Sequence, residues 1–308
     1  MICDTICLTS DQASLINHCI KHLIAEYRYL YSQKSSEYTE SITLLAQQIL
    51  TAIAQCDSPY HNLEHTVQVV LVGQEILHGM FLCDVKIPPD EWFNFIVALL
   101  CHDIGYLKGI CQSDIPEEQI FVTGTGKETV MLPPTATGAS LTPYHVDRGK
   151  QFVAETLSRD YPLVNVISIQ TAIELTRFPV PSDDLHKDTR QLPGLARAAD
   201  LIGQLADPAY LTKLPALFQE FEETGANSAL GYATPQDLRA GYPRFYWKGV
   251  SLYLKHGIRY LEMSKSGQAI LANLHGNRVV VEEELDRFYG ISRPIPEKGY
   301  SKGWVESR

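Results

Sequence analysis

Two short stretches of the sequence place metal-ligating side chains beside apolar runs. In "SPYHNLEHTVQVVLV", residues 58–72, His61 and His65 lie four positions apart, and "ALLCHDIGYL", residues 98–107, contains the adjacent pair His102 and Asp103. Ionisable side chains are costly to bury unless a charged or hydrogen-bonding partner accepts them. A metal ion is such a partner, because imidazole and carboxylate groups both ligate divalent cations.

The first stretch supports two interpretations when it is taken alone. Histidines four residues apart lie on one face of a helix and can reach a single ion. The string "HNLEH" also fits the H-x-x-E-H pattern of inverted zinc peptidases, in which Glu64 would act as general base. However, "SPY" before His61 favours a helix that begins near this residue. The peptidase interpretation also leaves His102 and Asp103 unexplained.

Two further features complete a set of candidate ligands. Neighbouring residues on a helix point in different directions, so His102 and Asp103 reach one ion only near a helix end. Gly105 follows at the position typical of a helix terminus. In "GLARAADLIGQLADP", Asp200 lies within an apolar helical pattern, where an aspartate is unfavourable without a specific partner. That partner is either a metal ion or a local group such as Arg197, one turn away.

The pattern of apolar residues predicts an all-α protein that positions these candidates. The expected helices cover residues 11–30, 40–56, 62–77, 89–102, 147–158, 164–176, 192–205, 210–223 and 244–263. We expect one domain, in which helices of residues 1–57 pack on a core of residues 58–290. Residues 291–308 form a tail, and residues 108–144 form an insert.

The insert contains two β-prone runs around a glycine-rich turn, "EQIFVTGTGKETVMLPP", which predicts a β-hairpin. Its "GTGKET" is not a phosphate-binding loop, because Phe121 occupies the required first glycine position and a strand is expected after Lys127. Long connections of this kind are usually functional. We predict that the insert folds over the site as a lid and sets substrate choice. The alternative is a hairpin that points away from the site and forms an oligomer contact.

Composition excludes several classes of function. The chain of 308 residues carries a formal charge of −10, which argues against a nucleic-acid polymer as partner. No apolar stretch reaches the length of a membrane span, and the first residues lack the pattern of a signal peptide. The cysteines show no CxxC pair and indicate reduced thiols in a cytoplasmic protein. They are Cys3, Cys7, Cys19, Cys56, Cys83, Cys101 and Cys111.

In this order, "YHNLEH", "HD" and "AADL" resemble the motifs of HD-domain metal-dependent phosphohydrolases, most closely the catalytic domain of cyclic-nucleotide phosphodiesterases. The resemblance covers about residues 59–207. It implies an all-α HD-type fold, with the hairpin inserted between the HD motif and the helix headed by His145. It also implies a first metal ion ligated by His65, His102, Asp103 and Asp200.

The same resemblance assigns further roles. Asp103 would bridge to a second ion, and His61 would be the general acid that protonates the leaving oxygen. His145 would face the site, and Thr176 would touch water on the second ion. The chain departs from the phosphodiesterases at Tyr106, where they carry another histidine. It also lacks their glutamine–phenylalanine purine clamp, so cyclic-nucleotide specificity does not follow.

The chemistry of these residue types supports hydrolysis of a phosphoester. A divalent ion (Zn, Fe, Mn, Ni or Mg) lowers the pKa of bound water, and one or two such ions are expected. Near neutral pH, His61 can donate a proton. Cations that flank the motifs either bind the phosphate of a small substrate or are solvated surface charges. They are Lys108, Arg148, Lys150 and Arg177.

Two other functions remain open at this point, an HD-type di-iron oxygenase and a catalytically silent metal or nucleotide sensor. The oxygenase needs more histidine ligands, and the sensor needs no proton donor. A homo-oligomer is also compatible with the sequence. The remaining histidines are expected to be structural, namely His18, His22, His78, His186, His256 and His275. The aromatic residues of 242–247 are expected to pack in the core or to wall a base-binding pocket.

Overall fold

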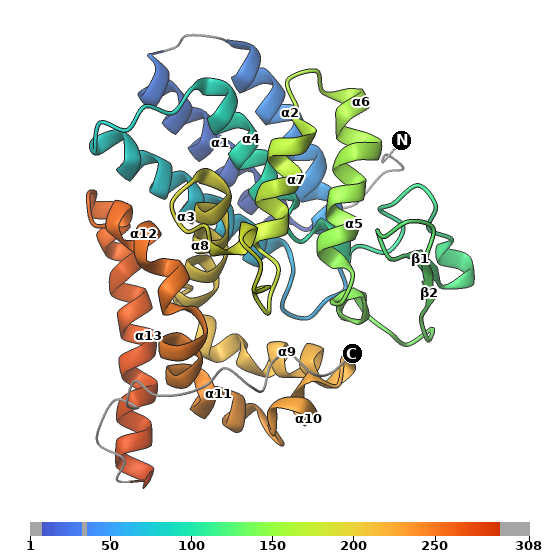
Figure 1. The fold of residues 1–308 in the computed structure, drawn as a ribbon, viewed down its shortest axis with the longest axis vertical. Coiled ribbons are helices and arrows are strands. Elements are labelled where there is room, and N and C mark those ends of the chain that lie inside the picture. Colours follow the sequence, from blue (N-terminus) through green and yellow to red (C-terminus); the bar gives the residue numbers. More distant parts are fainter. Residues whose placement is uncertain (1–7, 33–35, 290–308) are drawn as a thin grey trace.

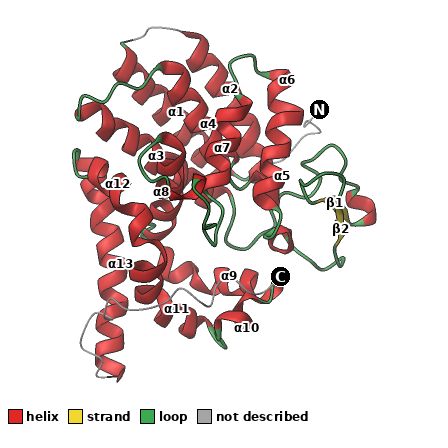
Figure 2. Ribbon diagram, viewed as in Figure 1, coloured by secondary structure: helices red, strands yellow, loops and turns green. Residues whose placement is uncertain are grey.

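The computed structural model describes residues 8–32 and 36–289, and the predicted tail of residues 291–308 lies outside them. The protein is predominantly α-helical, which confirms the predicted fold class (Figures 1 and 2). In chain order the helices are α1 (Ser10–Tyr31), α2 (Ser36–Ile53), α3 (Leu63–Leu82), α4 (Pro89–Cys101), α5 (His145–Phe152), α6 (Ser158–Asp160), α7 (Val166–Leu175), α8 (Leu192–Leu205), α9 (Tyr210–Glu223), α10 (Ala226–Leu230), α11 (Pro235–Arg244), α12 (Ser251–Leu261) and α13 (Lys265–Tyr289).

Helices α3 and α4 form the centre of the molecule. α3 packs against α8, α1, α4 and α12, and α4 packs against α7, α2 and α3. Every residue of α4 from Trp92 to Cys101 is buried, and most of α3 is buried as well. A helix that is apolar on all sides belongs in the interior. The two helices that carry the predicted HD motifs are therefore surrounded by other elements.

The N-terminal helices cover one side of this centre. The apolar stripe of α1, which includes Ile16, Leu23 and Tyr27, is buried. Thr9 caps α1 in a reciprocal pair with Gln12, which satisfies backbone N–H groups at the helix start. α2 packs on both α1 and α4. Helices α1 and α2 thus contribute to the main hydrophobic core of the protein.

The second half of the chain contains helices that the periodicity of the sequence did not reveal. These are the short α10, α11 and the long α13, which runs along one edge of the molecule (Figure 1). The predicted helix of residues 244–263 is a π-helical turn, Phe245–Val250, followed by α12. Similarly, the predicted helix of residues 147–158 begins at His145 and contains a π-helical turn, Val153–Leu157.

The insert contains the predicted hairpin. Strand β1 (Ile120–Val122) pairs with β2 (Thr129–Met131) in an antiparallel register that sets Phe121 opposite Val130. The hairpin lies at the edge of the molecule, beside α5 (Figure 1). It has its own small core, made of Phe121, Leu132, Ala136 and Leu141. Among the described residues, no helix combines the length and apolar character needed to cross a membrane.

Candidate metal centre

Four predicted ligands from three separate helices converge on one point. His65 lies in the first turn of α3, His102 and Asp103 follow the end of α4, and Asp200 lies in α8. Nε2 of His65 is 3.3 Å from Oδ2 of Asp103 and 3.5 Å from Oδ1 of Asp200. Nε2 of His102 lies 3.1 Å and 3.7 Å from the same two oxygens. The two Nε2 atoms are 3.4 Å apart.

Three of these five separations match the edges of a metal coordination shell, and the two that involve Asp200 are slightly longer. Two ligand atoms about 2.1 Å from one ion lie about 3.0–3.4 Å apart at octahedral or tetrahedral angles. In addition, Oδ2 of Asp103 is buried without a hydrogen-bond partner. Buried polar atoms are rarely left unsatisfied in proteins, and a cation at this point would satisfy the oxygen. The four residues therefore fit a divalent ion.

Backbone contacts orient the imidazoles for this role. Nδ1 of His102 lies 2.7 Å from the carbonyl oxygen of Leu99. A hydrogen on Nδ1 that donates to this carbonyl leaves the lone pair of Nε2 directed at the site. His65 is placed by Asn62, which caps α3 by accepting from the backbone N–H groups of Glu64 and His65.

The cluster is strongly attractive to positive charge. Burial lowers the pKa of His65, but the carboxylates of Asp103 and Asp200 outweigh it and raise this pKa to about 10. Burial likewise opposes ionisation of Asp103, yet the neighbouring histidines, His102 foremost, hold its pKa well below the ordinary value. The field that favours a proton on His65 also favours a divalent cation, and the two compete for the same nitrogen.

The competing local explanations for these residues do not match their contacts. Arg197 does not cap Asp200, because its guanidinium donates to the backbone carbonyls of His186 and Asp188. The carboxylate of Glu64, the general base in a peptidase arrangement, forms an exposed ion pair with Lys213 instead. Arg197 and Glu64 therefore have partners other than the candidate ligands.

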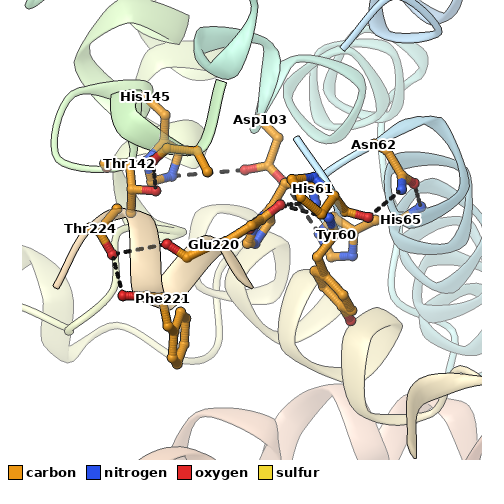
Figure 3. Close-up of polar contacts among 12 residues, drawn as sticks. Tyr60, His61, Asn62, His65, Asp103, Thr142, His145, Glu220, Phe221 and Thr224 are labelled. Atoms are coloured by element: carbon orange, nitrogen blue, oxygen red, sulfur yellow. Dashed lines mark hydrogen bonds and ion pairs between the residues drawn. The ribbon is translucent and has the colours of Figure 1, made fainter. Parts of the chain in front are cut away.

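A buried carboxylate holds the predicted general acid. His61 precedes α3, outside the regular helix, as "SPY" predicts, and its Nδ1 lies 2.5 Å from Oε2 of Glu220 in α9 (Figure 3). Oε1 of Glu220 accepts from the backbone N–H groups of Tyr60 and His61, at 2.6 Å and 2.9 Å. Burial lowers the pKa of His61, but Glu220 outweighs this effect and the pKa is raised. Because Nδ1 is held by Glu220, Nε2 is the nitrogen of His61 that can exchange a proton with a substrate.

Glu220 is not among the residues predicted from the sequence. The signal was an acid on the buried stripe of α9, where Tyr210, Leu214, Leu217 and Glu220 follow one another at helical spacing. Neighbouring glutamates in "FQEFEETG" concealed it, because a run of acids is usually a solvated face.

Of the predicted residues of the outer shell, His145 and Tyr106 lie beside the cluster, whereas the hydroxyl of Thr176 hydrogen-bonds within its own helix. Nε2 of His145 is 3.8 Å from Oδ1 of Asp103, and Nδ1 of His145 lies 2.6 Å from the carbonyl oxygen of Thr142 (Figure 3). The ring of Tyr106 stacks against His145. Thr176 ends α7, where its buried hydroxyl donates to the carbonyl of Ile173.

Arg148 is a structural residue, which corrects its assignment to the substrate shell. It is fully buried. Both of its terminal nitrogens donate to Asp114, and its other N–H groups donate to the carbonyls of Gly105, Leu107 and Val122. A guanidinium has five N–H donors, and all five are engaged. Arg148 therefore anchors the insert to the turn after the HD motif.

The other three flanking cations are also paired. Lys150 and Arg177 both bind Asp147 and Glu174, which ties α5 to α7. Lys108 binds Asp57 and a carbonyl of the insert. None of the three offers an unpaired charge to a phosphate. The sequence could not reveal this pairing, because the partners lie on other elements.

Glycine is required at position 105 for a reason other than the predicted helix cap. A Cβ atom on this residue would lie 1.9 Å from the backbone oxygen of His145. Glycine is therefore required for close approach between the HD turn and the start of α5, rather than for a left-handed backbone conformation.

The remaining histidines lie outside the metal-ligand groups of the described residues. They include His78, which pairs with Glu26, and His186, which pairs with Asp183. Of the aromatic residues of 242–247, Tyr242 and Tyr246 are buried in the core, whereas Trp247 is about half exposed.

The part of the insert that follows β2 contacts α9. There, Thr137 and Ser140 form hydrogen bonds to Glu223.

The sequence profile of the Npun_R2479-like family matches residues 9–284. This range extends from the cap of α1 into α13 and includes every residue of the site described above. A comparison with curated proteins finds no match. Since the profile spans most of the chain, the protein belongs to the Npun_R2479-like family.

Proposed function

We propose that the protein is a metal-dependent phosphohydrolase of the HD type, which cleaves a small phosphoester. The observation that carries this proposal is the juxtaposition of a four-ligand cluster with an imidazole held by a buried carboxylate. Nitrogen and oxygen atoms of His65, His102 and Asp200 lie within 4.8 Å of one another, and so do those of His61, His65 and Asp103. A phosphoester hydrolase needs both a cation and a proton donor.

His65, His102, Asp103 and Asp200 would hold the ion. When bound, a divalent ion supplies Lewis acidity toward a phosphoryl oxygen and toward the attacking water. The four ligands contribute two neutral imidazoles and two carboxylates, so their charge balances that of a divalent ion. Mixed nitrogen and oxygen ligands suit zinc, iron, manganese or nickel better than magnesium.

His61 would supply the proton for the leaving oxygen. Its Nδ1–H donates to Glu220, so the protonated ring carries a second hydrogen on Nε2. The carboxylate raises the pKa of His61, which favours the imidazolium near neutral pH. Transfer of the Nε2 proton leaves a neutral ring still bonded to Glu220. General acid catalysis of this kind contributes about 10²–10⁴-fold to rate.

The charge balance of the site favours a phosphodiester. With an ion bound, the ligand cluster is neutral, and the pair of His61 and Glu220 is neutral as well. The four cations flanking the motifs are engaged with other protein groups. A dianionic monoester would therefore find no additional positive charge among them, whereas a diester carries a single negative charge.

The two alternatives receive less support. A sensor that only binds metal needs no proton donor, yet both the backbone N–H and Nδ1 of His61 are held by Glu220. A di-iron oxygenase needs ligands for two ions. The two candidate ligand groups in the described residues share His65, so they do not form two separate sites.

Metal analysis combined with a substrate panel tests the proposal. Protein purified without chelators would be analysed by plasma mass spectrometry. It would then be assayed with Zn²⁺, Mn²⁺, Fe²⁺ and Ni²⁺ against bis(p-nitrophenyl) phosphate, p-nitrophenyl phosphate and cyclic nucleotides. We expect bound transition metal and metal-dependent turnover, with diesters ahead of monoesters. Bound metal without turnover of any ester would favour the sensor, and protein that binds no metal would refute the assignment.

A further inference from the structure

Three aromatic rings form a stack beside the candidate ligands. The ring of Tyr106 lies between those of His61 and His145, with centroids 4.8 Å and 4.5 Å away. The planes are nearly parallel, at 13° and 15°. Tyr106 belongs to the short 3₁₀ turn, Ile104–Tyr106, that directly follows Asp103. Its side chain therefore comes from the same turn as a candidate ligand.

The backbone gives this stack little freedom. The close approach of Gly105 to the backbone of His145 joins the turn to the start of α5. Nδ1 of His61 is held by Glu220, and Nδ1 of His145 faces the carbonyl of Thr142. The side chain of Tyr106 is buried, and it packs between the other two rings. The two imidazoles are thus fixed by polar contacts, and Tyr106 is fixed by packing between them.

The two oxygens of Asp103 face different surroundings. Oδ2 lies among the nitrogens of His65 and His102, within the four-ligand cluster. Oδ1 faces Nε2 of His145 at 3.8 Å. A second ion beside Oδ1 would therefore find this oxygen and the imidazole of His145. The imidazole of His61 also lies near Asp103, but it is bound to Glu220 and is separated from His145 by the ring of Tyr106. Catalytic transition-metal sites of the zinc type use at least three protein ligands.

Tyr106 keeps two imidazoles from converging on such an ion. Its ring packs on the face of His145, and the ring of His61 packs against it as well. The candidate ligand groups among the described residues also share His65, which has one Nε2 to offer. We propose that the centre holds a single transition-metal ion, and that Tyr106 is the residue that prevents a second ion from being held beside Oδ1 of Asp103.

This inference rests on the metal site of the proposed function, and metal stoichiometry tests it without reference to activity. The protein would be stripped with EDTA and dialysed to equilibrium against Zn²⁺, and bound zinc per chain would be measured by plasma mass spectrometry. A parallel sample loaded with Mn²⁺ would be examined by electron paramagnetic resonance. Two coupled ions give an exchange-split spectrum, whereas a single ion gives six lines.

Four variants give the test its internal controls. Wild type, Tyr106→Phe and His145→Ala should each bind one ion per chain, because none of these changes adds a ligand. Tyr106→His supplies a third ligand beside Oδ1 and should bind two ions. Adding His145→Ala to Tyr106→His should return the count to one.

The wild-type stoichiometry decides the inference even if Tyr106→His does not fold. Two ions in wild type would overturn it while leaving the metal site intact. No bound ion in wild type would overturn the metal site and the proposed function together. If wild type binds one ion and folded Tyr106→His also binds one, Tyr106 is not the determinant.

Discussion

Replacement of Glu220 by glutamine isolates the contact that defines the proton donor. The substitution preserves shape, and Oε1 can still accept from the backbone N–H groups of Tyr60 and His61, at 2.6 Å and 2.9 Å. The amide nitrogen then takes the place of Oε2, 2.5 Å from Nδ1 of His61. An amide N–H donates a hydrogen bond to a ring nitrogen and cannot accept one from it. His61 therefore loses the partner of its protonated form.

The expected loss follows from the strength of this contact. A hydrogen bond to a charged group contributes about 1.5–3 kcal/mol. Each 1.36 kcal/mol corresponds to a factor of about ten in rate, so kcat/KM should fall by about 10- to 150-fold. The pH dependence should change as well. Activity that requires protonated His61 falls as pH rises through its pKa, which Glu220 raises. In Glu220→Gln that fall should move to lower pH.

The assay compares two leaving groups. An alkyl phosphodiester turned over by the wild type needs a proton on its leaving alkoxide, whereas bis(p-nitrophenyl) phosphate does not. Glu220→Gln should lose activity on the first and retain most of it on the second, with unchanged metal content. Glu223→Gln is the matched control, because Glu223 lies on the same helix and contacts the insert. Equal losses on both substrates together with metal loss would show that His61 is a ligand.

Three further predictions concern the ligands and the insert. Asp103→Ala should abolish metal retention and activity together, and full metal content in that variant would contradict the ligand assignment. Arg148→Leu should destabilise the fold by about 3–5 kcal/mol in urea denaturation, since it leaves Asp114 as an unpaired buried charge. Adding Asp114→Leu should recover part of this loss, and an additive result would count against the pair. Replacing Gln119–Met131 with a Gly-Ser linker should leave metal content and Michaelis constants unchanged, because the strands lie at the edge of the molecule (Figure 1). Altered substrate ranking would instead support the prediction that the insert folds over the site.

The sequence by itself determined the helical architecture and the candidate ligands. Apolar periodicity is a local property, so α8 and α9 have the predicted bounds and α3 and α4 begin within one residue of prediction. Chemical type and order identified His65, His102, Asp103 and Asp200 as a set, and the fold brings them together. Their role as ligands remains a prediction. Helix α13 was missed because a smaller proportion of its residues is apolar than in α3 or α4.

Only the tertiary structure decided the partners of these residues. Glu220 lies far along the chain from His61, and no local pattern joins an acid of α9 to the loop before α3. The sequence left Arg148 as either a phosphate ligand or a solvated surface charge, and its burial against Asp114 gives it a structural role instead. The position of Tyr106 between the imidazoles of His61 and His145 was likewise decided by the tertiary structure. Side chains distant in sequence meet through helix packing, which depends on the whole core rather than on neighbouring residues.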